Sequence, residues 1–176
     1  IQGEGGYLVP PEGFLAGLRA LCDRHGILLI FDEVQSGIGR TGRMFASEHW
    51  GVVPDIISLA KGLGSGLPIG AVVARRALMQ RWSRGAHGNT YGGNPVTCAA
   101  AIATLDLVEH EYAANAAAMG EYFIGRLRDL AARHDCIAEV RGRGLMIGME
   151  LVEDRRTMAP ARELVEALTT RAFHNG

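Results

Sequence analysis

Two short apolar runs constrain the fold most, because each ends in a charged residue. Residues 27–31, "ILLIF", lead into Asp32, and residues 55–60, "DIISLA", lead into Lys61. Continuous β-rich runs without polar alternation are typical of strands that helices cover on both faces of a parallel sheet. The sequence therefore predicts an α/β fold in which both strands end at a charged side chain.

The residues next to these runs predict one helix and one antiparallel strand. "PPEGFLAGLRALCDRHG" places apolar residues at helical spacing over roughly 11–25, with Pro11 in the first turn and Gly26 at the C-cap. The strand "GAVVAR" follows Lys61 after only about eight residues, whereas a parallel crossover needs about a dozen. We therefore expect this strand to run antiparallel to the one before it.

The second half of the chain is mainly helical by composition. We expect two long Ala-rich helices, "CAAAIATLDLVEHEY" and "NAAAMGEYFIGRLRDLAARH", the first beginning after Pro95. The short strands "CIAEVRG" and "GLMIGMEL" follow, and a last helix is expected from about Ala159 to His174.

This order of elements predicts two unequal domains. Residues 1–96 would form part of a large, mostly parallel α/β domain, 97–113 a linking helix, and 114–176 the start of a small α+β C-terminal domain. The chain opens at Ile1 without a methionine, and Gly176 resembles a helix cap before a further strand. We therefore expect an internal piece of a longer protein.

Charge and composition narrow the class of partner. Lysine and arginine together number 18 against 19 acidic residues, and the scattered basic residues form no stripe for nucleic acid or a membrane. No apolar stretch reaches the ~18 residues of a membrane span. Cys22, Cys98 and Cys136 are far apart, and the histidines lack metal-ligand spacing. We expect a cytoplasmic protein with no metal site, whose partners are small molecules or other protein chains.

Lys61 is the only lysine in the chain, against seventeen arginines. Ligands of open α/β sheets bind outside the carboxyl ends of the strands, so Lys61 and Asp32 should meet in one cleft. An amine and a carboxylate suit pyridoxal phosphate, because the amine forms a Schiff base and the carboxylate keeps the pyridine nitrogen protonated. Arginine does not deprotonate and cannot replace the lysine. Taken singly, a solvated lysine and a strand-end cap are the simpler interpretations.

Two nucleotide-binding patterns compete with this interpretation. "GIGRTG" at 37–42 matches G-x-G-x-x-G, but five residues separate it from the strand and no long helix follows, as a dinucleotide loop requires. "LLIFDE" resembles the magnesium-binding strand of nucleotide hydrolases, but Lys61 in "SLAKGLG" does not fit their phosphate loop. A hydrolase remains a remote alternative.

Five motifs carry a family resemblance over nearly the whole chain: "QGEGGY", "DEVQSGIGRTG", "PDIISLAKGLGSGLPIG", "HGNTYGGNP" and "VRGRGLMIGMEL". Together they resemble the class III, or ω-amino-acid, aminotransferases, which are fold type I enzymes of pyridoxal 5'-phosphate. The resemblance is greatest to the 4-aminobutyrate group, with acetylornithine and ornithine enzymes nearby. It implies amino transfer from an ω-amino acid or related amine to a 2-oxo acid. An aminomutase of the same fold and a non-catalytic relative are further alternatives.

The resemblance implies a role for each of five residues in cofactor binding. Lys61 would hold the cofactor as a Schiff base and move the proton during the reaction, while Asp32 would pair with the pyridine nitrogen. Val34 would pack on one ring face, and Gln35 would donate to the phenolic oxygen. Thr90 would reach the cofactor phosphate of the neighbouring subunit, which implies a homodimer with a shared active site.

Substrate choice is implied to depend on Glu4. In similar enzymes this glutamate pairs with an arginine and so switches the site between an ω-amino substrate and the α-carboxylate of glutamate; here that arginine would lie beyond Gly176. Arg141 also matches a family position, and we interpret it as structural. The phosphate cup and the ring-stacking aromatic residue would precede Ile1, so we expect the isolated 176-residue piece to bind the cofactor weakly or not at all.

Overall fold

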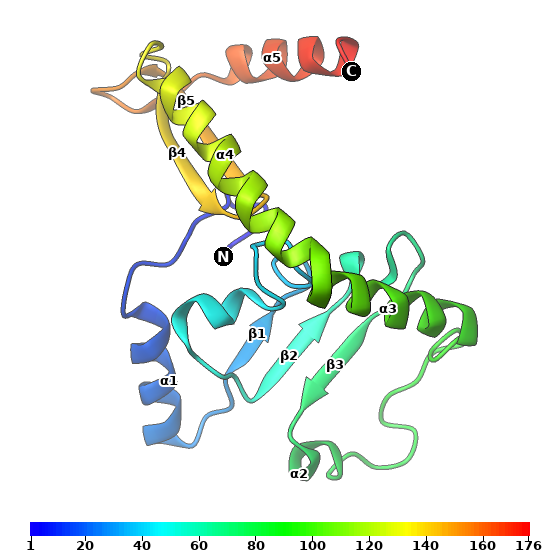
Figure 1. Cartoon of the computed structure of the whole chain (residues 1–176). Coiled ribbons are helices and arrows are strands. Elements are labelled where there is room, and N and C mark those ends of the chain that lie inside the picture. The colour runs from blue at the N-terminus through cyan, green and yellow to red at the C-terminus, as the bar shows by residue number, and fades with distance from the viewer.

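The structure, a computed structural model, describes all residues from Ile1 to Gly176 (Figure 1). Two three-stranded sheets lie toward opposite ends of the molecule, and a long helical run joins them (Figure 1). The elements in chain order are α1 (Phe14–His25), β1 (Ile30–Asp32), η1 (Ala46–Trp50), β2 (Ile56–Leu59), η2 (Lys61–Gly64), β3 (Ala71–Ala74), α2 (Arg76–Met79), α3 (Pro95–Leu107), η3 (Val108–Tyr112), α4 (Ala113–Ala131), β4 (Ile137–Arg143), β5 (Met146–Asp154), β6 (Ala159–Pro160) and α5 (Arg162–His174).

The first sheet has the strand order β1-β2-β3. β1 and β2 run parallel, with Ile30 opposite Ile56 and Asp32 opposite Ser58. β3 runs antiparallel to β2, so the direction predicted from the short connection is confirmed. The carboxyl ends of β1 and β2 therefore lie at the same edge of the sheet, where the two charged residues of the apolar runs follow.

The strand expected from "ILLIF" is shorter and more open than predicted. β1 begins only at Ile30, and the side chains of Ile27, Leu28 and Ile30 are 56%, 48% and 57% exposed. Leu29 is buried, in a cluster that includes residues of α1. Within these 176 residues, α1 packs on the side that carries Leu29, and no other α-helix covers β1.

Helix α1 also begins later than predicted, at Phe14 rather than near residue 11. Gly13 precedes it with a φ of 81°, a left-handed conformation that stops the helix from extending toward Pro11. Its C-cap is the left-handed Gly26, as the sequence predicted.

A buried carboxylate fastens the first sheet to α1. Asp55, just before β2, is 7% exposed. Its Oδ2 accepts hydrogen bonds from Arg19 Nη1 and the Leu29 N–H, both at 2.8 Å, and its Oδ1 accepts one from Arg75 Nη2 at 2.6 Å. The bond from the Leu29 N–H, and then that from Arg19, lowers the pKa of Asp55. One carboxylate therefore joins α1, the approach to β1 and the end of β3.

The two long helices expected after Pro95 form one continuous run from Pro95 to Ala131. The π-helical turn η3 connects α3 to α4, and its five residues include neither glycine nor proline to break the helix. The run passes the end of the first sheet, where α3 packs against η2, and continues to the second sheet, so a single helical rod connects the two (Figure 1).

The "GIGRTG" loop lies against this rod. A Cβ atom at Gly39 would lie 2.9 Å from Val108 Cγ1, and one at Gly42 would lie 2.8 Å from the Ala117 Cβ. The 3₁₀ helix η1, rather than a long helix, follows the loop. These glycines let the loop approach η3 and α4 closely, which accounts for the motif without a nucleotide.

The second sheet is antiparallel, with the order β4-β5-β6. Ile137, Leu151 and Ala161 are buried together, and residues from α4 and α5 pack around them. Helix α5 begins at Arg162 rather than near Ala159, because the residues of β6 pair with β5 first.

Three further observations bear on the class of protein. None of the helices is both long and apolar enough to span a lipid bilayer. No group of three or more His, Cys, Asp or Glu side chains is placed to hold a metal ion. Cys22, Cys98 and Cys136 are free thiols.

Candidate active site

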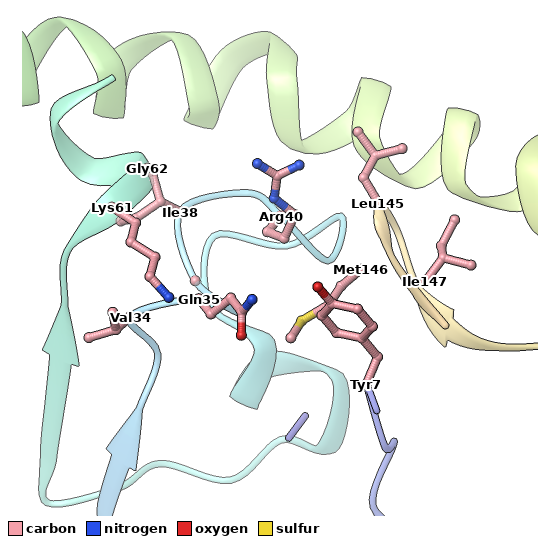
Figure 2. Close-up of a pocket in the computed structure, with 11 residues that line it drawn as sticks. Tyr7, Val34, Gln35, Ile38, Arg40, Lys61, Gly62, Leu145, Met146 and Ile147 are labelled. Carbon is pink, nitrogen blue, oxygen red and sulfur yellow. The ribbon is translucent and has the colours of Figure 1, made fainter. Parts of the chain in front are cut away.

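Two adjacent cavities meet at Lys61, beside the carboxyl ends of β1 and β2. One, of about 260 Å³, is lined by Lys61, Asp32, Val34 and Gln35 together with residues 1–4 and Ser36. The other, of about 360 Å³, shares Lys61, Val34 and Gln35 and extends to β5 (Figure 2). Asp32 and Lys61 therefore line one cavity, as expected from their positions after the carboxyl ends of β1 and β2. Glu4 lines the same cavity.

Lys61 follows β2 in an unusual backbone conformation. Its φ is 45°, in the left-handed region that non-glycine residues seldom adopt. The side chain points toward Val34 and Gln35 (Figure 2), and its amine forms no ion pair. Such strained residues occur at functional sites, where the surrounding structure holds a side chain in one direction. Lys61 therefore presents an unpaired amine to both cavities.

Asp32 ends β1 and keeps one carboxylate oxygen available. Its Oδ1 accepts a hydrogen bond from the Val34 N–H at 3.0 Å, which turns the chain at the end of the strand. Its Oδ2 is left for another donor. A carboxylate in this position can bind a ring N–H that enters the cavity.

Glu33, next to Asp32, is a buried carboxylate that the sequence did not single out. It is 2% exposed, and it accepts hydrogen bonds from the N–H groups of Ala46 at 2.7 Å and Ser47 at 2.8 Å. The Ser36 hydroxyl adds a third, at 3.3 Å. Glu33 therefore fixes the turn after β1 to the start of η1, and this turn carries the cavity residues on either side of it.

Glu4 and Gln35 are joined across the smaller cavity. Gln35 Nε2 donates to Glu4 Oε1 at 3.2 Å. Gly3 allows this approach, because a Cβ atom there would lie 1.7 Å from Gln35 Oε1. The loop of residues 3–7 therefore lies directly on the Gln35 side chain.

Thr90 is not brought to these cavities. It is exposed in the loop between α2 and α3 and lines neither of them. Its expected contact is with a neighbouring subunit's cofactor, and that role stays a prediction.

Several residues that line the larger cavity were not predicted from the sequence. Tyr7, Met146 and Ile147 come from the N-terminal segment and β5 and line the larger cavity opposite Lys61 (Figure 2). No local pattern marks them, because they reach the site only through tertiary packing. Ile38 and Arg40 also line it, from the "GIGRTG" loop. Ile38 has a φ of 52°, so the surrounding glycines were the available signal for a constrained loop.

The family model for class-III aminotransferases matches residues 1–176. An acetylornithine aminotransferase from Corynebacterium efficiens is 54% identical over 151 residues, which are 86% of this chain and 37% of that protein. The 5-aminovalerate aminotransferase DavT from Pseudomonas aeruginosa is 46% identical over 177 residues, covering 100% of this chain and 42% of that protein.

A solved structure gives the same result. The crystal structure of an amine transaminase from an uncultivated Pseudomonas species, in a PLP-bound form, superposes with a TM-score of 0.85 and 46% identity. The match covers 91% of this chain and 38% of that one, so the chain spans about two fifths of the length of the relatives it matches. The predicted α/β class of fold type I is confirmed. This chain therefore belongs to the class-III aminotransferase family.

Proposed function

We propose that the protein carrying this chain transfers an amino group from an ω-amino acid or related amine to a 2-oxo acid, with pyridoxal 5'-phosphate as its cofactor. The observation that carries the proposal is the unpaired amine of Lys61 in one cavity with Asp32, Val34 and Gln35. The family membership supports it.

The side chains around Lys61 fit this cofactor chemically. The amine can bond to an aldehyde carbon, and Asp32 Oδ2 can accept a hydrogen bond from a ring N–H. The Gln35 amide can donate to a phenolic oxygen, and Val34 offers an apolar surface to a ring face. When bound, the cofactor supplies an electron-withdrawing ring that stabilises negative charge on the substrate carbon.

Lys61 has two roles in this proposal. Its Nζ would hold the cofactor covalently. When freed by a bound substrate amine, the same Nζ would carry the proton to and from the substrate carbon as a general base and acid. The charge on Asp32 would hold the ring nitrogen in its protonated form.

Glu4 is the proposed substrate-selecting residue. Its carboxylate favours a cationic partner in the cavity and repels a substrate carboxylate placed beside it. Two relatives are named acetylornithine aminotransferase and 5-aminovalerate aminotransferase. Both named substrates are aliphatic acids that carry an amino group. The proposed donors are therefore 4-aminobutyrate, 5-aminovalerate and acetylornithine, and an assay with each as sole donor would rank them.

We also propose that the protein works as a homodimer, in which the exposed Thr90 loop completes the site of the neighbouring subunit. The division into residues 1–96, 97–113 and 114–176 is part of this proposal. Free cysteines favour a reducing, cytoplasmic location.

Replacing Lys61 tests the proposal in the whole protein. Borohydride reduction in the presence of pyridoxal phosphate should fix the cofactor's mass on the peptide containing Lys61. Lys61→Ala and the charge-matched Lys61→Arg should both lose this label and at least about 100-fold in amino transfer, because neither provides the nucleophile or the proton carrier. Unchanged labelling and turnover in both variants would remove the basis for the proposal, and unchanged hydrolysis of a nucleotide would favour a hydrolase.

A further inference from the structure

The loop that carries Glu4 is held by two separate parts of the structure. At one end, Gly3 and Glu4 lie against Gln35, in the loop after β1. At the other end, the loop lies against β4 and β5 of the second sheet, more than a hundred residues further along the chain. The position of Glu4 therefore depends on contacts with both sheets.

Arg141 on β4 makes the main contact at the second end. Its Nε donates to the Gly6 carbonyl at 2.8 Å, while its Nη1 binds Glu139 at 2.7 Å and Glu150 at 2.5 Å. The Arg141 side chain is 14% exposed. Two carboxylates thus fix the guanidinium so that its Nε–H points at the loop.

The backbone of the loop is shaped for this contact. Gly6 has a φ of 117°, which side-chain-bearing residues rarely adopt, and a Cβ there would lie 3.0 Å from Arg141 Nη2. Gly148 on β5 leaves room on the other side, since a Cβ there would lie 3.0 Å from the Gly6 carbonyl oxygen. The amides of Gly6 and Tyr7 both donate to the Gly3 carbonyl, at 3.0 Å and 2.9 Å, so the loop closes as a compact turn.

We propose that Arg141 is a positioning residue for substrate selection: by holding the Gly6 carbonyl it sets where the Glu4 carboxylate lies in the cavity beside Lys61. The inference rests on the proposed function for the role of Glu4. Arg141 touches neither cavity, so it acts through the loop alone. A change at Arg141 should therefore alter the recognition of the amine more than the proton transfer by Lys61.

Arg141→Lys is the informative variant. Lysine keeps a positive charge between Glu139 and Glu150, but it lacks the planar fork that reaches the carboxylates and the Gly6 carbonyl together. Arg141→Met serves as the stronger variant where it folds. Arg143→Lys and Arg143→Met are the matched controls, because they make the same two replacements two residues further along β4, where the side chain lies over Trp50 instead of the loop.

The first measurement needs no turnover. In the cofactor-free whole protein, hydrogen exchange at the amides of Gly6 and Tyr7 should become about tenfold faster in Arg141→Lys and remain unchanged in Arg143→Lys. Equal exchange in the wild type and Arg141→Lys would overturn the proposal, whatever substrate the protein uses.

The second measurement separates positioning from general loosening. Arg141→Lys should raise KM for the amine donor about tenfold with kcat changed less than about twofold, because Glu4 is displaced while Lys61 is not. In a Glu4→Gln background the same substitution should have little further effect, since coupled residues are not additive. An equal KM change in both backgrounds would show that Arg141 does not act through Glu4. A wild type without amino transfer would instead disprove the proposed function, and the exchange result would still decide whether Arg141 holds the loop.

Discussion

Asp55 Oδ2 and Arg19 Nη1 lie 2.8 Å apart, and this contact joins α1 to the strand that leads to Lys61. The carboxylate is buried, and it also receives the Leu29 N–H and Arg75. The position of the lysine thus depends on an ion pair at the opposite end of β2.

Asp55→Asn should destabilise the protein by about 2 kcal/mol, because it leaves Arg19 without its buried partner and weakens the bond to Leu29. The matched control is Asp23→Asn. Asp23 also binds Arg19, at 2.5 Å, but its side chain is 65% exposed, so the loss should stay below about 0.5 kcal/mol. Urea unfolding of the two variants measures the difference. Equal losses would mean that burial of Asp55 adds nothing.

The lowered pKa of Asp55 predicts a dependence of stability on acid. The folded state holds this carboxylate ionised more strongly than the unfolded chain does, where its pKa is 3.8. Its contribution is therefore complete above pH 3.8 and is lost as the pH falls through the lower folded value. Unfolding midpoints measured from pH 5 downward should fall less steeply in Asp55→Asn than in the wild type, and parallel curves would contradict the prediction.

Two glycines of α4 should respond to alanine in opposite ways. A Cβ at Gly120 would lie 2.2 Å from the Gly144 carbonyl oxygen, so Gly120→Ala should cost about 2 kcal/mol by forcing α4 away from the turn between β4 and β5. Gly125 has nothing within 4 Å of the same position, and Gly125→Ala should stabilise the helix by about 1 kcal/mol. Thermal unfolding of both variants gives the comparison. A loss at both positions would mean that helix propensity does not determine stability here.

Asp32→Asn separates binding of the cofactor from its activation. The asparagine keeps the Val34 contact and the shape of the cavity, but it removes the charge that would hold a ring nitrogen protonated. We expect amino transfer to fall about 10- to 100-fold while covalent attachment through Lys61 persists. Absorbance of the bound cofactor and turnover, measured together, test this. Unchanged turnover would exclude a role for the Asp32 charge.

The sequence predicted the parts of the site that local rules control. Apolar runs and the strand-end rule placed Asp32 and Lys61 at one cavity, and the length of a connection gave the direction of β3. It could not predict contacts between distant segments. Glu33 binds amides 13 and 14 residues away, and Arg141 reaches Gly6 across 135 residues, so no short pattern marks either.

The open faces of β1 could not be predicted for the same reason. The residues of "ILLIF" have the composition of a strand that is covered on both faces. Composition indicates only which surroundings would stabilise such a strand. Ile27, Leu28 and Ile30 are exposed within these 176 residues, and the chain spans about two fifths of its relatives' length. Composition therefore predicted a β-strand here, whereas the burial of that strand depends on which other elements pack against it.

The π-helical turn between α3 and α4 has a consequence for insertions and deletions. A π turn contains about one residue more than an α turn, and one residue of an α-helix corresponds to about 100° of rotation. The wider turn accommodates this extra residue, and beyond it Ala117 faces the "GIGRTG" loop and Gly120 faces Gly144. Deleting one residue from η3 should therefore restore a regular α turn and leave these small residues in place, whereas a deletion between η3 and Ala117 should rotate the rest of α4 by about 100°. The side of α4 that meets the loop lining the cavity of Lys61 should thus tolerate the loss of a residue at η3 better than the loss of one just after it.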